Sequence, residues 1–159
     1  MGGVLSAVTV AAFLVMLAAV ALTDWITMEI PDRFTAALAV IGVVSIVTMP
    51  EISPGSRLAG VFSVSVPLFL MTYFIPGAFG GGDIKLMGAC GLLLGWKLSL
   101  VSLVLAILTG GSYGIWLLAA GKKGCKDHFA FGPFLCLGMF LALFWGEELV
   151  DWYLGLCGL

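Results

Sequence analysis

The sequence predicts an all-α, polytopic membrane protein with six transmembrane helices. Of its 159 residues, 62% are hydrophobic and only 10% are charged, and the mean hydropathy is +1.19. Since a soluble domain has about half apolar and a quarter charged residues, this composition excludes a water-soluble globule. At about 20 residues for each membrane helix, the length allows roughly five or six spans and no extramembrane domain. We therefore expect a single membrane-embedded domain over residues 1–159.

Six apolar runs define the expected helices. In chain order they are Val4–Thr23, Phe34–Met49, Leu58–Phe79, Ile84–Trp96, Leu98–Ala120 and Phe129–Trp145. The first run is too long for a signal peptide and no basic residue precedes it, so we expect a retained helix. The second is short, but Pro31 suits the first position of a helix and would extend it. The fourth is the shortest, about 20 Å at the helical rise.

Loop charges predict the orientation and support a crossing by the fourth run. With six spans, five basic residues lie at one membrane face and two at the other. Because basic residues are in excess in cytoplasmic loops, we expect the first face to be cytoplasmic in an inner (plasma) membrane, with both termini outside. Without the fourth crossing, three lysines would move outside. The first set is Arg33, Lys85, Lys122, Lys123 and Lys126, and the second set is Arg57 and Lys97.

Other features of the sequence indicate structure rather than chemistry. Gly91 and Gly95, and likewise Gly110 and Gly114, have the four-residue spacing that lets neighbouring membrane helices approach closely. The acids and aromatic residues of the C-terminal tail are expected to extend the last helix at the outer interface. The four cysteines form no CxxC pair, which argues against a zinc site, and a net charge of -2 leaves no basic patch for nucleic acid.

Two aspartates stand beside apolar runs on the same side of the membrane. Asp24 terminates the first run, and Asp83 follows the third. The two spans between them form one hairpin, so both acids lie at the same face whichever way the protein inserts. An ionisable residue in a membrane is costly and is a functional candidate by default. The plainer interpretation is that Asp83 caps the fourth helix and that Asp24 lies in interfacial water.

Three consecutive glycines, at positions 80 to 82, directly precede Asp83. Glycine weakens a helix and lets the backbone approach another group closely, so this segment could let an extended peptide lie beside the acid. Two carboxylates a few ångströms apart do not both ionise easily and share a proton. The charged one activates water, and the protonated one polarises the scissile carbonyl. This is the chemistry of an aspartyl protease, which needs no metal and no cofactor.

Residues 80–83 match the GxGD signature of intramembrane aspartyl proteases. With Asp24 and the Ile-Pro pair at 30–31 upstream, the chain resembles the prepilin peptidase branch of that class. Residues 131–135, Phe-Gly-Pro-Phe-Leu, are similar to the late FGPF-type segment of the same branch. The resemblance covers nearly the whole chain. It points to the short members without an N-terminal methyltransferase region, so methylation is not expected.

The resemblance implies that Asp24 and Asp83 are catalytic. It also implies substrate-binding or supporting roles for seven residues: Gly80, Gly81, Gly82, Lys85, Pro31, Gly132 and Pro133. The implied substrate is a prepilin or pilin-like precursor, whose short basic leader is removed at the cytoplasmic end of its hydrophobic helix. Glu29 and Asp32 either attract such a leader or are solvated loop charges. Lys85 either acts at the site or extends to the lipid headgroups.

Two other classes of function remain open at this stage. A small six-span transporter or channel component could use the membrane-edge aspartates to bind a cation, since broken helices and membrane acids occur in transporters. Both acids are expected at one face, however, and no acid lies near the middle of a span. A structural subunit of a secretion machine would explain the hydrophobicity but not the pair of aspartates.

Overall fold

A computed structural model describes residues 2–75, 79–121 and 130–157 of the chain. Within these ranges all regular structure is helical, which confirms the all-α prediction. The five helices are α1 (Gly2–Thr27), α2 (Asp32–Thr48), α3 (Pro54–Phe74), α4 (Gly81–Ala119) and α5 (Gly132–Cys157). The predicted positions of Phe129, of the basic loop with Lys122, Lys123 and Lys126, and of the cysteine at 125 lie outside the described residues.

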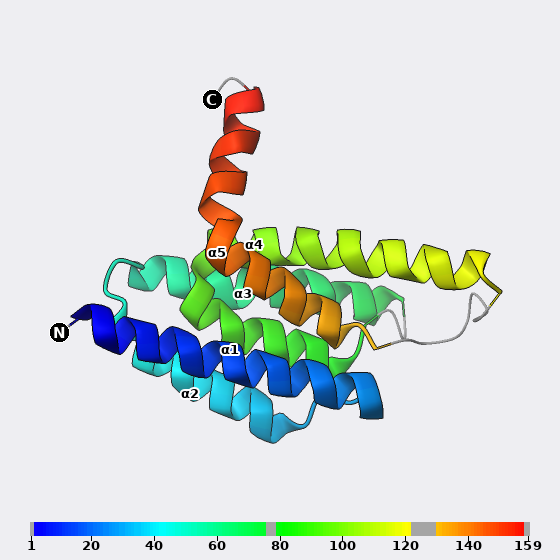
Figure 1. Ribbon diagram of the computed structural model, residues 1–159, viewed down its shortest axis with the longest axis horizontal. Coiled ribbons are helices and arrows are strands. Elements are labelled where there is room, and N and C mark those ends of the chain that lie inside the picture. Colours follow the sequence, from blue (N-terminus) through cyan, green and yellow to red (C-terminus); the bar gives the residue numbers. More distant parts are fainter. Residues whose placement is uncertain (1, 76–78, 122–129, 158–159) are drawn as a thin grey trace.

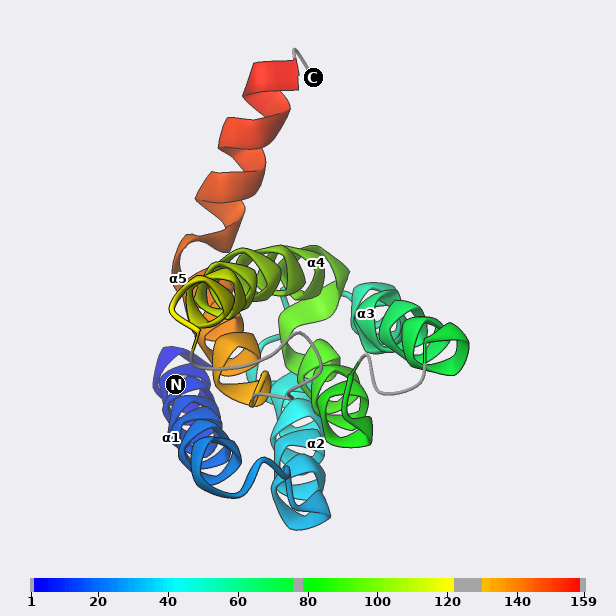
Figure 2. The same cartoon turned by 90° about the vertical axis from the view of Figure 1, so that its right-hand side faces the viewer.

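Helix α4 is the centre of the packing. It contacts α2, α3 and α5, while α1 packs against α2 and α5 (Figure 2). The fully buried side chains of α4, among them Leu86, Met87 and Leu93, form the core together with Phe13 of α1 and Met139 of α5. The first part of α4 is therefore surrounded by α2, α3 and α5.

The long helix α4 is interrupted at Gly95, where the chain doubles back on itself (Figure 1). Gly95 has φ 71° and ψ 177°, a region of backbone space that is essentially restricted to glycine. The two helical parts on either side correspond to the predicted runs Ile84–Trp96 and Leu98–Ala120. A Cβ on Gly91 would collide with the backbone of Gly60 on α3, so the predicted close approach of backbones is confirmed for this glycine.

Several predicted boundaries were displaced by a few residues. Helix α1 continues through Asp24 to Thr27, so this acid lies inside the helix and does not end it. Helix α2 begins at Asp32, and Pro31 is its extended N-cap residue rather than its first helical residue. Helix α3 ends at Phe74 instead of Phe79.

The helices have the length and the surface of a polytopic membrane protein. Four of them in the described part are long and apolar enough to cross a membrane: Gly3–Thr27, Pro54–Phe74, Gly81–Ala119 and Gly132–Leu156. Large apolar side chains cover the outside of the molecule, and Val47 on the shorter α2 is 83% exposed. Such an apolar surface is stable in lipid and not in water, in agreement with the sequence-based prediction.

Arg57 at the start of α3 is buried, although the sequence assigns it to an outer loop. It is 2% exposed and donates five hydrogen bonds of 2.6 to 3.2 Å. The acceptors are the carbonyls of Ser45, Met49, Ile52 and Leu92 and the hydroxyl of Ser45. The last carbonyls of a helix have no partner within it. Arg57 supplies hydrogen-bond donors to those at the end of α2, and its bond to Leu92 connects this end to α4 just before Gly95.

Candidate active site

Asp24 is held on α1 by the first residue of α5. Its side chain is 5% exposed, and its Oδ2 accepts a hydrogen bond of 3.0 Å from the backbone N–H of Gly132. A Cβ at position 132 would lie 2.7 Å from that oxygen, so only glycine allows this approach without displacement. Because the first N–H groups of a helix have no partner within it, the start of α5 is suited to hold a carboxylate.

Asp83 lies in the first turn of α4 and is 7% exposed. Its Oδ2 accepts a hydrogen bond of 3.2 Å from the N–H of Gly80. Gly80 is the extended N-cap residue, with φ -72° and ψ 145°, and Asp83 is the third residue of the helix. The interpretation of Asp83 as the N-cap residue is therefore wrong by three positions, although the side chain does stabilise the helix start.

The glycine run is mostly helical. Gly81 and Gly82 are the first two residues of α4, and only Gly80 is extended. Gly81 has open space where a side chain would be, whereas a Cβ on Gly82 would lie 3.0 Å from Cβ of Ile30. The run therefore does not form an extended segment of three residues, and it is Gly82 that allows the loop between α1 and α2 to approach α4.

Ile30 connects the surroundings of the two acids. Besides its approach to Gly82, its Cδ1 lies 3.2 Å from the position of a Cβ on Gly132, the residue that binds Asp24. The two carboxylates are close enough for the charge of Asp24 to act on Asp83, and the thiol of Cys136 on α5 lies near both. The structure thus brings Asp24 and Asp83 together at one end of the bundle, between α1, α4 and α5.

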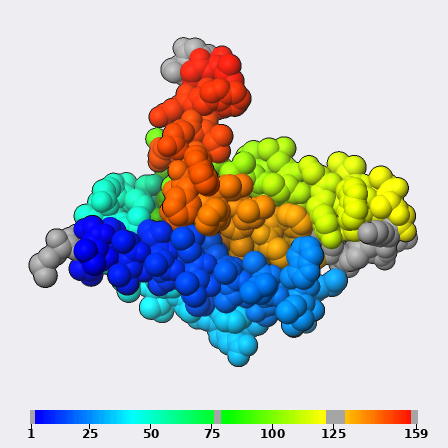
Figure 3. Space-filling view, viewed as in Figure 1, coloured from blue at the N-terminus to red at the C-terminus, as the bar shows by residue number. Residues whose placement is uncertain are grey.

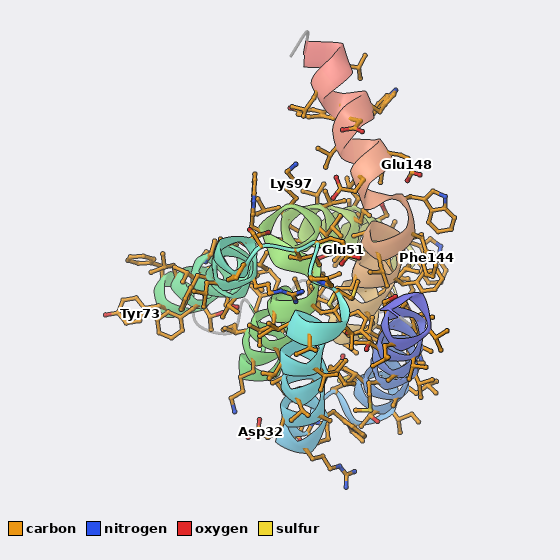
Figure 4. All side chains as sticks on the ribbon, turned by 90° about the vertical axis from the view of Figure 1, so that its left-hand side faces the viewer. Asp32, Glu51, Tyr73, Lys97, Phe144 and Glu148 are labelled. Carbon is orange, nitrogen blue, oxygen red and sulfur yellow. The ribbon has the colours of Figure 1, made fainter. Side chains whose placement is uncertain are left out.

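The buried acids have no cationic partner among the described residues. The ion pair in that part of the chain joins Lys85 Nζ to Asp32 Oδ1 at 2.8 Å, with exposed fractions of 58% and 75% for the two side chains. Lys85 therefore contacts α2 rather than the carboxylate of Asp83. Figure 4 shows Asp32 at the end of α2 opposite to Glu51.

An open groove of about 390 Å³ lies between α2 and α4 on the side of this ion pair. It is lined by Asp32, Thr35, Ala36, Ala39, Lys85, Gly88 and Ala89. Neither buried aspartate lines it. On a helix, Lys85 and Ala89 lie about 200° and 240° around the axis from Asp83, so the groove and the aspartates lie on opposite sides of α4.

Aromatic side chains surround the aspartate end. The ring of Trp25, next to Asp24, lies 6.1 Å from that of Tyr113 on α4, and Tyr113 lies 5.3 Å from Phe134 on α5. Phe79, ahead of the glycine run, lies 5.4 Å from Phe131. Gly132 and Pro133 are the first two residues of α5, so this helix begins at the aspartate end.

Sequence reasoning missed two residues at this end of the bundle. Ile30 was noted only as part of a motif, although it contacts the surroundings of both acids. Cys136 enters the sequence analysis only as one of four cysteines without a CxxC pair. It is 4% exposed and lies near both carboxylates. Its position four residues after Gly132 places it one helical turn deeper on the same side of α5, which is a usable signal.

These elements define a membrane protein with a pair of buried aspartates, and comparison with known proteins identifies the family. Residues 11–115 match the type IV leader peptidase family. The chain belongs to this family, which confirms the resemblance found in the motifs.

Curated relatives extend the match over most of the chain. The prepilin leader peptidase/N-methyltransferase of Legionella pneumophila is 30% identical over 132 residues, which are 79% of this chain and 46% of that protein. The proteins of the same name from Aeromonas hydrophila and Bacillus subtilis are 31% and 30% identical over 92% and 89% of this chain. The chain spans about half the length of these relatives, 53% and 57% for the last two. No solved structure shows a significant match to it.

Proposed function

We propose that this chain is an aspartic endopeptidase of the membrane that removes the leader peptide of prepilin-like precursors at the cytoplasmic face. The observation that supports it most directly is the pairing of Asp24 and Asp83. They are buried carboxylates from different helices, they interact with each other, and each is bound by one backbone N–H and by no cation of the described residues. Family membership supplies the class of reaction.

The two acids divide the chemistry between them. One is charged and removes a proton from the attacking water, while the other is protonated and donates a hydrogen bond to the scissile carbonyl. Each carboxylate uses Oδ2 to accept a backbone hydrogen bond. Because helix N-termini favour negative charge, the starts of α4 and α5 stabilise the charged member of the pair.

The proposed topology has six spans, with the two parts of α4 counted separately. The doubling back at Gly95 supports this count, because it makes a helical hairpin from one continuous element. Tryptophan and tyrosine, which prefer the membrane interfaces, support it too. Trp25, Tyr73, Tyr113 and Trp116 belong to the aspartate end, and Trp96, Trp145, Trp152 and Tyr153 to the other. The aspartate end then faces the cytoplasm, and both termini lie outside.

The proposed substrate is a precursor with a basic leader ahead of a hydrophobic helix. Its helix would lie in the bilayer beside the protein, which places the cleavage junction at the level of the aspartates. Glu29 is exposed in the loop after α1 and offers a negative charge to the leader. Asp32 is occupied by Lys85, so a leader would have to compete with this lysine.

The transporter alternative is not favoured by the geometry. A conduction path needs polar groups along the depth of the membrane. The buried charged residues of the described ranges are instead separated, with Asp24 and Asp83 at one end and Arg57 at the other.

The test is cleavage of a pilin-like precursor, with a basic leader, by the purified chain in lipid vesicles. Asp24→Asn and Asp83→Asn are each expected to lower the rate at least about 100-fold, the usual minimum contribution of a general acid or base. Asp32→Asn, which removes an exposed acid, is the matched control for the loss of one negative charge. Processing at the parental rate by either of the first two variants, when they insert and fold normally, would contradict the proposal.

A further inference from the structure

The last part of α5 leaves the helical bundle. Figure 1 shows it running steeply across the direction of the other helices, and Figure 3 shows it standing clear of the rest of the molecule. Phe144 lies on the part of α5 that packs along the bundle, whereas Glu148 lies on the part that leaves it (Figure 4). Between them, a Cβ on Gly146 would lie 2.5 Å from Cδ2 of Leu98. The departure therefore lies close to the reversal of α4, at the end of the bundle away from the aspartates.

The departing segment, residues 146–156, is amphipathic together with Trp145 before it. Large apolar side chains recur every three or four residues and share one face of the helix. They are all exposed, with Trp152, Tyr153 and Leu156 each more than 60% exposed; the complete set is Trp145, Leu149, Trp152, Tyr153 and Leu156. Three acids, Glu147, Glu148 and Asp151, lie on the other face, together with Val150 and the 38% exposed Leu154. No lysine or arginine follows position 126.

We infer that this segment lies flat on the outer surface of the bilayer, with its apolar face in the outer leaflet and its acids in water. An amphipathic helix of low net hydrophobicity takes this position at a membrane surface. Tryptophan and tyrosine are the side chains that prefer the headgroup level. The absence of basic residues in this part of the sequence agrees with a non-cytoplasmic position.

Lipid fits this face better than a second protein chain. Ring contacts of 5.1 Å between Phe140 and Phe144 and of 5.8 Å between Phe144 and Trp145 lead from the exposed surface of the bundle to the departing segment. Trp145, the first residue of the apolar face, thus contacts an aromatic side chain of the bundle surface that lies in lipid. A stable protein interface takes about 20–30 residues on each side, far more than this segment provides.

The attachment would fix the depth of α5 in the membrane. The same helix begins at Gly132, whose N–H binds Asp24, so a segment at the outer surface contributes to the position of a group at the opposite end. This inference depends only on the membrane location of the chain, and it can fail or hold whether or not the chain cleaves prepilins.

The test compares the two faces of the segment in the full-length chain, reconstituted in phosphatidylcholine vesicles. In a background with Cys125→Ser and Cys157→Ser, a thiol-reactive, polarity-sensitive fluorophore is placed by Tyr153→Cys on the apolar face or by Asp151→Cys on the acidic face. The buried Cys90 and Cys136 are checked for lack of labelling. We expect lipids with a nitroxide on the acyl chain to quench the fluorophore at 153 several-fold more than at 151. Aqueous iodide should show the reverse order.

A second pair, Leu149→Cys and Glu147→Cys, repeats the comparison one helical turn earlier and protects against a local effect of labelling. Equal access of iodide to both faces would overturn the inference, because the segment would then project freely into water. It would also be overturned if position 153 were shielded from both quenchers and energy transfer occurred between donor-labelled and acceptor-labelled copies. That result would identify a second copy of the chain as the partner of the apolar face.

Discussion

The two ends of the helical bundle both bury charged side chains, but these side chains differ in how completely they are hydrogen-bonded. At one end, Arg57 donates five hydrogen bonds and so uses all the directions of its guanidinium group. At the other end, Asp24 and Asp83 each accept one hydrogen bond from a backbone N–H in the described structure. A carboxylate has about four lone-pair sites, so most of the acceptor capacity of these acids is left.

This difference distinguishes a charged group that stabilises the structure from acids that are available for a reaction. A buried charge that is fully hydrogen-bonded makes the structure around it rigid, and Arg57 connects the end of α2, the start of α3 and the reversal of α4 in this way. Two buried acids with spare acceptor sites are costly to the fold. Their free lone pairs are available to water and to a substrate carbonyl, which fits the role proposed for them.

The largest effect on stability is expected at the end of the bundle that contains Arg57. Arg57→Met should lower the free energy of unfolding by about 3 kcal/mol or more, because several buried acceptors lose their donor at about 1–3 kcal/mol each. The measurement is unfolding in mixed detergent micelles. The exposed Arg33 provides the control, and Arg33→Met should change the value by no more than about 0.5 kcal/mol.

At the other end, Asp83→Asn should be no less stable than the parent chain, since it removes a buried charge that has no cation among the described residues. If Asp83→Asn destabilised the protein as strongly as Arg57→Met, the acids would be structural and the distinction between the two ends would be lost.

The reversal of α4 should be the next most sensitive position. Gly95→Ala places a side chain in a glycine-only backbone conformation, at about 1–3 kcal/mol, and its Cβ would lie 2.6 Å from the hydroxyl of Ser56. We expect a loss of about 2–3 kcal/mol in the same unfolding measurement. Gly55→Ala, at a helical position with open space around it, should be neutral or slightly stabilising. Equal stability of both variants would show that the turn does not require glycine.

The order and type of the helices could be predicted because a membrane restricts the choices. A spanning segment must be apolar and must satisfy its own backbone, so apolar runs of the right length become helices. The break between the fourth and fifth runs was predicted at Lys97, two residues from the reversal at Gly95, but the backbone conformation of the turn could not be predicted. Its backbone conformation depends on Ser56 and Ile52, which lie next to it in space, and the glycine spacing predicted only close packing.

Of the candidate site, the two acids could be predicted and their partners could not. Charge is so rare in this chain that Asp24 and Asp83 stand out, but the hydrogen-bond donor of Asp24 is a backbone N–H 108 residues away. The acceptors around Arg57 are mostly backbone carbonyls. Because every residue has such groups, no pattern of side chains marks which of them a buried charge will use.

A smaller effect, on activity rather than stability, is expected where α5 meets Asp24. Gly132→Ala adds a Cβ 2.7 Å from Oδ2 of Asp24, so the carboxylate must move and its bond to the N–H is disturbed. We expect precursor cleavage to fall about tenfold, equal to about 1.4 kcal/mol in the activation barrier. Gly111→Ala, with open space around it on α4, should retain the parental rate. An unchanged rate in Gly132→Ala would mean that this contact does not position the acid.

The exposed ion pair at the aspartate end should have the smallest effect. In a double-mutant cycle of Lys85→Met and Asp32→Asn, the coupling between the two side chains should be below about 1 kcal/mol, as for other surface pairs. It should fall further when the ionic strength is raised from 0.01 M to about 1 M, because salt screens exposed charges. Arg57 provides the comparison, since its buried hydrogen bonds should not respond to salt. A coupling of several kcal/mol that persists in salt would contradict this prediction. The end with the aspartates would then be held by charge as firmly as the end with Arg57, and the proposed difference between a rigid end and a reactive end would not hold.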